Sequence, residues 1–299
     1  MASPAETPHE LGVIHDIGFR HYTGPRLGRD YLLRSLYGES LKGAYGLGRS
    51  AKSKVLPFLL LAVMVLPALI IAVVAGATNA DKLPVAYSRY AINLSVVISV
   101  YLASQSPASV SRDLRFRVMP LYFSRPLSRN DYVLAKFAAM ASALFIVMGT
   151  PLLVLYVGAL LDKLSFWTQT RGFVGALIGI SLLSALLSAI GLLIASITPK
   201  RGFGVAAMIT VLILLSLVSA SLQQVALNRN NDSLSGYFGL ISPFGLVDSV
   251  QAWVLSEHRP RGTVPPGATG GVVALFVTLA VIATCYSLLI LRYRKVSAS

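Results

Sequence analysis

Six stretches of the sequence are long, apolar and free of ionisable side chains. A helix needs about 20 mostly apolar residues to cross the hydrocarbon core of a bilayer, since each residue adds about 1.5 Å. The sequence therefore predicts an all-α integral membrane protein with six transmembrane helices. These lie at Val55 to Gly76, Tyr90 to Ser106, Phe137 to Leu161, Gly172 to Ile197, Phe203 to Leu227 and Gly271 to Leu291, and none contains Asp, Glu, Lys, Arg or His.

The composition agrees with a chain embedded in lipid. Of the 299 residues, 55% are hydrophobic and only 13% are charged, and the mean hydropathy is +0.69. A soluble domain carries about 25% charged residues. The net charge of +14 would suit nucleic acid, but the Lys and Arg residues flank the apolar stretches and form no single basic stripe. We therefore expect the lipid bilayer, and no nucleic acid, as a partner.

The cations predict the orientation of the chain. Nineteen of the 26 Lys and Arg residues lie before the first stretch, between the second and third, between the fourth and fifth, or after the sixth. Lys and Arg in short loops are retained on the cytoplasmic side. We expect a multi-pass protein of the cell membrane, inner or plasma, with both termini in the cytoplasm. The polar start of the chain, without a cleavable signal sequence before Asp30, favours the same orientation.

The outer segment between the fifth and sixth stretches, residues 228–270, contains a further apolar run. Ser233 to Leu255 is apolar apart from Asp248, but a seventh span would place the C-terminal cations outside, against the charge pattern. Ser242 is a suitable N-cap, and Pro243 would then occupy the first helical position. We expect short helices that dip into the outer membrane face or lie on it.

The N-terminal segment, residues 1–54, precedes a six-span domain at residues 55–299 and predicts an amphipathic helix. Asp30 is its expected N-cap. Such a helix with basic flanks suits the inner membrane surface, and packing on another protein element is the alternative. The predicted apolar face comprises Leu33, Leu36, Tyr37, Leu41 and Ala44, with Arg34, Glu39 and Lys42 opposite.

Small and hydroxylic residues are patterned inside two of the stretches. Ser95, Ser99 and Ser106 share one face of the second, where close helix packing and a substrate pathway both remain open. In the fourth, Gly175 and Gly179 form a GxxxG pair that favours close packing with a neighbouring helix.

Several kinds of chemistry are missing from the sequence. The spans lack the carboxylates, His or basic residues that proton- or sodium-coupled carriers place at membrane depth. No Walker A or G-x-G-x-x-G pattern occurs, and the four His and single Cys lack metal-ligand spacing. We therefore expect no catalytic residue, no bound metal and no cofactor on this chain. Active transport would need energy from a separate subunit.

The cytoplasmic loop between the second and third stretches, residues 107–136, is the candidate docking site for that subunit. It mixes cations with large apolar side chains, which offers both charge and an apolar anchor to a partner. Ser128 is a suitable N-cap for the helix that enters the third stretch, and Pro126 fixes the turn before it. Contact of a basic segment with anionic lipid is the alternative.

At this loop the sequence resembles the ABC-2 type permeases, the membrane subunits of a class of ATP-binding-cassette exporters. The topology of the whole chain is also similar to that family. One departure is Arg117-Val-Met-Pro120, where the family often has a Glu-x-Gly-Thr-like run. The resemblance is carried by Arg112, Asp113, Leu121, Arg125, Pro126, Leu127, Ser128, Arg129 and Lys136.

The resemblance implies a dimer of permeases, identical or paired with a paralogue, with two ATP-hydrolysing subunits below that bind ATP and Mg. It implies that the cytoplasmic loop transmits ATPase closure to the spans, through Arg112, Asp113, Arg115, Leu121, Tyr122, Phe123, Arg125, Pro126, Ser128, Arg129 and Lys136. It also implies a substrate pathway that we assign to Ser95, Ser99, Ser106, Thr210, Ser216 and Ser219. Such an apolar lining with scattered hydroxyls suits an amphipathic or hydrophobic cargo. The alternatives are a gradient-driven secondary carrier and a non-transporting membrane scaffold that recruits a cytoplasmic partner.

Overall fold

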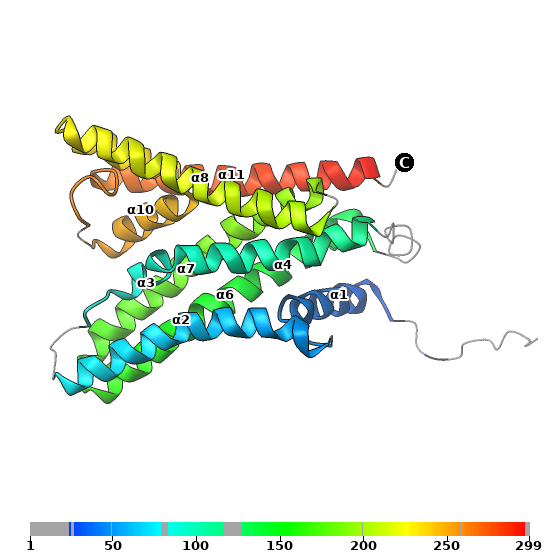
Figure 1. Ribbon diagram of the computed structural model, residues 1–299, viewed down its shortest axis with the longest axis horizontal. Helices are drawn as coiled ribbons and strands as arrows, with labels where there is room; N and C mark the ends of the chain where they lie inside the picture. The colour runs from blue at the N-terminus through cyan, green and yellow to red at the C-terminus, as the bar shows by residue number, and fades with distance from the viewer. Residues whose placement is uncertain are drawn as a thin grey trace, which may run out of the picture.

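The structure, a computed structural model, describes residues 24, 27–48, 50–78, 83–115, 127–198, 200–257 and 259–296. Every regular element in these ranges is an α-helix (Figure 1). The helices are α1 (Arg29–Ala44), α2 (Ala51–Ala77), α3 (Tyr87–Asn93), α4 (Ser95–Arg115), α6 (Arg129–Leu161), α7 (Phe166–Ile197), α8 (Arg201–Asn228), α9 (Asp232–Gly239), α10 (Pro243–Leu255) and α11 (Gly267–Val296).

Five of the six predicted apolar stretches lie within single long helices. These helices are α2, α6, α7, α8 and α11, and each is long and apolar enough to cross a membrane. Their surfaces carry many exposed large hydrophobic side chains, as expected of helices that face lipid. The prediction of an all-helical, multi-pass membrane protein is confirmed at this level.

The second predicted stretch differs from the other five. The chain breaks at Leu94 between α3 and α4, and α4 does not reach the hydropathy of the other long helices. The reason lies in its second half, where Ser104, Gln105, Ser106 and Pro107 follow one another. A sixth candidate span arises only if α9 and α10, which are bent by 118° to each other, are counted as one.

The core lies where α4, α6 and α7 pack together. Tyr101 and Leu102 of α4 and Leu144 of α6 are fully buried there. A Cβ at Gly191 of α7 would lie 2.7 Å from a methyl carbon of Leu102, so the glycine permits close approach of α4. Gly191 therefore serves helix packing.

The GxxxG pair of α7 receives α10. A Cβ at Gly179 would overlap the side-chain amide of Gln251, and one at Gly175 would overlap Leu255. The predicted close packing is confirmed, with the short helix α10 as the neighbour. Ser242 is also confirmed as the N-cap of α10 with Pro243 at its first turn, although the Ser242 side chain makes no capping hydrogen bond.

Helix α1 packs against α6 of the same chain. Tyr37 donates a hydrogen bond to the Ser142 hydroxyl of α6 at 2.9 Å, and Tyr45, just past the helix, donates to the Ala143 carbonyl at 2.8 Å. The prediction of Asp30 as N-cap is wrong: the N-cap is Gly28, and Asp30 lies in the first turn. A carboxylate there still complements the positive end of the helix dipole. Helix α1 and the C-terminal end of α11 lie at one end of the bundle, and α10 lies toward the other (Figure 1).

Candidate functional site

Both ends of the predicted cytoplasmic loop are anchored to the bundle. Lys136, in the second turn of α6, is buried and donates a hydrogen bond to the Ser109 carbonyl near the end of α4 at 3.0 Å. The same ammonium lies 5.5 Å from the centre of the Tyr132 ring. The bond joins residues 27 positions apart, one near each end of the predicted loop. Helices α4 and α6 are thereby held together where the loop leaves them.

The start of α6 carries a capping box, and a side chain of α1 bonds to it. Asp131 donates its backbone N–H to the Ser128 hydroxyl at 3.2 Å, and its carboxylate accepts the backbone N–H of Ser128 at 3.0 Å. The carboxylate also accepts two hydrogen bonds from the guanidinium of Arg29 in α1, at 2.8 and 2.5 Å. Ser128 is therefore confirmed as the N-cap. Arg29, Ser109, Ser128, Asp131 and Lys136 together form what we call the loop mount.

The ion pair of the loop mount lies before the apolar stretch of α6 that is predicted to cross the membrane. Helix α6 has 33 residues and is about 50 Å long, which exceeds the hydrocarbon thickness by several turns. Asp131 precedes its apolar run, which begins at Phe137. Hydrogen bonding to Arg29 lowers the pKa of Asp131 to about 2, helped by the bonds to Ser128. The carboxylate is thus charged at any physiological pH.

The remaining predicted loop residues are only partly within the described structure. Arg129 is exposed in the first turn of α6, and Leu127 before it is buried. Arg112, Asp113 and Arg115 belong to the last turn of α4, and their side chains are outside the description. Leu121, Tyr122, Phe123, Arg125 and Pro126 lie outside the described residues.

The six predicted pathway residues lie on α4 and α8. Ser99 and Ser106 are buried against neighbouring helices, and the Ser106 hydroxyl would lie 2.8 Å from a Cβ at Gly191 of α7. Ser99 donates to the backbone carbonyl of Ser95 at 2.7 Å. On α8, Thr210 is exposed, Ser216 lies 3.4 Å from the Ser242 hydroxyl, and Ser219 donates to the Phe238 carbonyl at 3.0 Å.

At the opposite end of the bundle, a buried guanidinium joins three segments. The side chain of Arg259 is only 2% exposed and donates to Asp248 of α10 at 2.9 Å and to Glu257 at 2.5 Å. It also donates to Ser88 of α3 at 3.1 Å, and Ser88 donates to Glu257 at 2.5 Å. We call Ser88, Asp248, Glu257 and Arg259 the outer ion cluster, because the charge pattern of the sequence predicts the outer side for this end of the bundle. It carries two carboxylates and one cation.

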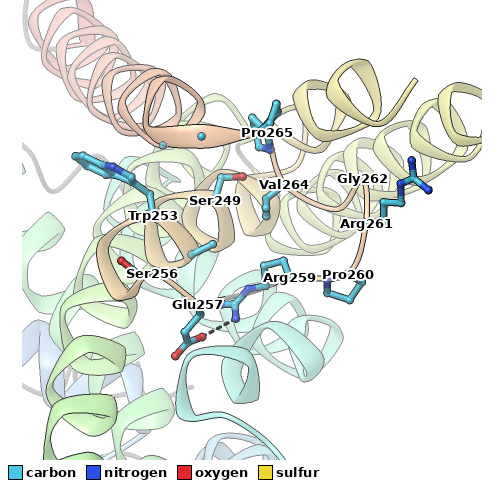
Figure 2. A pocket seen from close by; sticks show the side chains of 14 residues that line it. Ser249, Trp253, Ser256, Glu257, Arg259, Pro260, Arg261, Gly262, Val264 and Pro265 are labelled. Carbon is cyan, nitrogen blue, oxygen red and sulfur yellow. Dashed lines mark hydrogen bonds and ion pairs between the residues drawn. The ribbon is translucent and has the colours of Figure 1, made fainter. Parts of the chain in front are cut away.

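A cavity of about 520 Å³ borders the outer ion cluster. It lies between α10 and the chain that returns to α11, and its lining mixes Ser249 and Glu257 with Val264 and Pro265 (Figure 2). The indole of Trp253 and the guanidinium of Arg261 point away from its centre (Figure 2). Arg261 is 84% exposed and pairs with Asp232 at the start of α9. The cavity therefore lies at the surface of the described bundle.

Sequence reasoning missed the ion pairs at both ends of the bundle. The predicted loop residues include Ser128 and Lys136 but neither Arg29 nor Asp131, and the outer ion cluster was not anticipated. The capping-box spacing of Ser128 and Asp131 is the one local signal that could have identified Asp131.

Among the described residues, no group of three or more His, Cys, Asp or Glu could hold a metal ion. A scan against protein-family models finds no match, and a search of the curated proteins finds none either.

Proposed function

We propose that this chain is the permease subunit of an ATP-binding-cassette exporter. It moves an amphipathic or hydrophobic substrate, such as a drug, a lipid or a natural product, outward across the cell membrane. A separate cytoplasmic subunit, present in two copies, binds ATP and Mg and hydrolyses the nucleotide. A second permease, identical or paralogous, completes the complex. The chain itself is not an enzyme.

The observation that carries this proposal is the loop mount. A partner that pushes on the loop between α4 and α6 acts on helices that are bonded to each other by Lys136 and to α1 by Arg29. The buried Lys136 ammonium makes a strong charge-assisted hydrogen bond, whereas the Arg29 side chain is 62% exposed and solvent partly screens its pair with Asp131. The push therefore moves the ends of three helices together instead of bending a free loop. A coupling device needs this property.

The uncharged spans support an external source of energy. The apolar runs of α2, α6, α7, α8 and α11 contain no titratable Asp, Glu, Lys, Arg or His. A carrier driven by protons or sodium would use such groups at membrane depth. This feature favours ATP hydrolysis on a partner over an ion gradient.

Six crossings form part of the proposal, with α3 and α4 as the second. Helix α4 packs against α7 and α8 and runs lengthwise beside α7 in the bundle (Figure 1). The predicted stretch, Tyr90 to Ser106, has 17 residues, at the short end of the range for a transmembrane helix. Its polar residues are tolerated there because Ser99, Gln105 and Ser106 are buried in protein. The bent pair α9 and α10 then enters and leaves on the outer side, and both termini are cytoplasmic.

The experiment is to purify the tagged chain from its native membranes and to measure ATP hydrolysis that co-purifies with it. We expect vanadate-sensitive hydrolysis, which Arg125→Glu and the pair Tyr122→Ala and Phe123→Ala reduce at least tenfold while the chain stays folded. Arg229→Glu is the matched control, because it reverses an exposed charge at the other end of the bundle. Dye efflux from vesicles that persists without ATP, and stops with a proton ionophore, would instead establish a secondary carrier. No co-purifying hydrolysis from native membranes would overturn the proposal.

A further inference from the structure

A second cavity lies on the side of the bundle that faces lipid, between α2 and α6. It has a volume of about 450 Å³. Its walls are apolar side chains of both helices, among them Leu69, Val73, Leu153 and Val157, and each of these is exposed at the surface of the chain. In a bilayer, the molecules that meet this groove are lipids. The inference that follows does not depend on transport.

One carboxylate closes the end of the groove. Asp162 is the C-cap of α6, and this residue lines the groove beside Leu161. It packs so closely on α2 that a Cβ at Gly76 would overlap the carboxylate. The Oδ2 atom is buried and has no hydrogen-bond partner within the described structure. An unsatisfied buried acceptor is costly, so this atom calls for a donor.

The surroundings of Asp162 favour a cation beside its carboxylate. Helices α2 and α6 both end beside it, at Ala77 and Leu161, and neither has a basic residue in its last turn. Each helix C-terminus contributes about half a negative charge, which adds to that of the carboxylate. Lys163 follows directly in the sequence, but in the described structure no ion pair joins it to Asp162. The end of the groove is therefore an electronegative spot beside an apolar channel.

The position of Asp162 matches the level of lipid headgroups. It directly follows the apolar run of α6 that ends at Leu161, at the end of the bundle away from α1. A lipid whose acyl chain occupies the groove would bring its headgroup to this carboxylate. Of the common headgroups, ethanolamine offers a primary ammonium with three N–H donors, choline is a cation without a donor, and glycerol phosphate has a net negative charge.

We propose that the groove between α2 and α6 binds a phosphatidylethanolamine molecule, with an acyl chain against Val73 and Val157 and its ammonium on the Asp162 carboxylate. Of the three headgroups compared above, only ethanolamine supplies both the positive charge and the missing donor, so charge complementarity selects it.

The test is native mass spectrometry of the purified full chain with phosphatidylethanolamine, phosphatidylcholine and phosphatidylglycerol of identical acyl chains. We expect the ethanolamine lipid to be retained about tenfold more strongly than the other two, the scale of one charge-assisted hydrogen bond. The first two lipids differ only in N-methylation, so this comparison needs no variant. Equal retention of the three lipids by the natural chain would overturn the proposal.

Three variants locate the site. Asp162→Asn removes the charge, and Gly76→Ala displaces the carboxylate without changing its charge, so each abolishes the preference for ethanolamine. Val157→Phe fills the groove and lowers retention of all three lipids. Asp232→Asn, which removes a carboxylate that is already paired with Arg261, is the matched control and leaves the preference intact.

Two results would contradict the assignment of the site. The first is an unchanged ethanolamine preference in both Asp162→Asn and Gly76→Ala. The second is a change in the oligomeric mass of Val157→Phe without a change in lipid retention, because that result would make a second copy of the chain the occupant of the groove.

Discussion

Replacing Arg259 by Met tests whether the outer ion cluster holds together the end of the bundle opposite α1. The guanidinium is 2% exposed and bonds side chains from α3, from α10 and from the chain after α10. Met keeps most of the side-chain volume but removes the charge and every donor. The change leaves Asp248, 8% exposed, beside Glu257 with no cation between them.

The expected loss in the free energy of unfolding is about 3–5 kcal/mol, the cost of removing one partner from a buried ion pair. The matched change, Arg261→Met, also breaks an ion pair, but that guanidinium is 84% exposed. Solvent screens such a pair, so its loss costs at most about 1 kcal/mol. The two variants remove the same group from positions two residues apart and differ mainly in burial.

Reversible unfolding in mixed micelles of dodecyl maltoside and SDS, followed by circular dichroism, measures both losses. The combined variant Arg259→Met, Asp248→Asn and Glu257→Gln leaves no unpaired charge, and we expect it to recover more than half of the loss. Equal losses for Arg259→Met and Arg261→Met, or no recovery in the combined variant, would refute the argument from burial.

Three further predictions concern single residues. Ser128→Ala removes the hydroxyl of the capping box and costs about 1 kcal/mol in the same assay, whereas Ser165→Ala at the N-cap of α7, where the side chain makes no capping bond, costs a few tenths at most. Gly179→Ala forces Gln251 away and costs about 1–3 kcal/mol, while Gly202→Ala, with no atom within 4 Å of its Cβ, has no such cost. Because the pKa of Asp131 is lowered from 3.8 to about 2, its contribution to stability is complete above about pH 5 and is lost as the pH falls toward 2, so acid unfolding of Asp131→Asn lacks this component.

Most of the helices could be predicted because their signals are local. The long apolar runs of α2, α6, α7, α8 and α11 are visible from hydropathy alone. Ser128 and Ser242 were recognised as N-caps from the residue type and its position before an apolar run. The face of α1 followed from its 3.6-residue period, and Leu36 and Ala44 of that face are buried.

What escaped prediction depends on contacts between distant segments. Arg29 and Asp131 are 102 residues apart, and Ser88 and Arg259 are 171 apart, so no window of the sequence contains either pair. The difficulty with α4 is different. Its Ser and Gln residues lower its hydropathy below that of a lipid-facing helix, and only the fold shows that they are buried by α7 and other helices.

The loop mount and the outer ion cluster both bond to the continuous stretch of chain that forms α3 and α4. The loop mount holds the end of α4 through the Ser109 carbonyl, and the outer ion cluster holds α3 through Ser88. Between them the helix is interrupted at Leu94. A displacement of α4 driven from the loop can therefore be absorbed at Leu94 while α3 stays bonded to Arg259, or it can pull on the outer ion cluster. In the permease that we propose, the first outcome leaves transport intact when Arg259 is replaced by Met. The second outcome makes Arg259 necessary for opening the outer side, so the transport rate of that variant in vesicles separates the two.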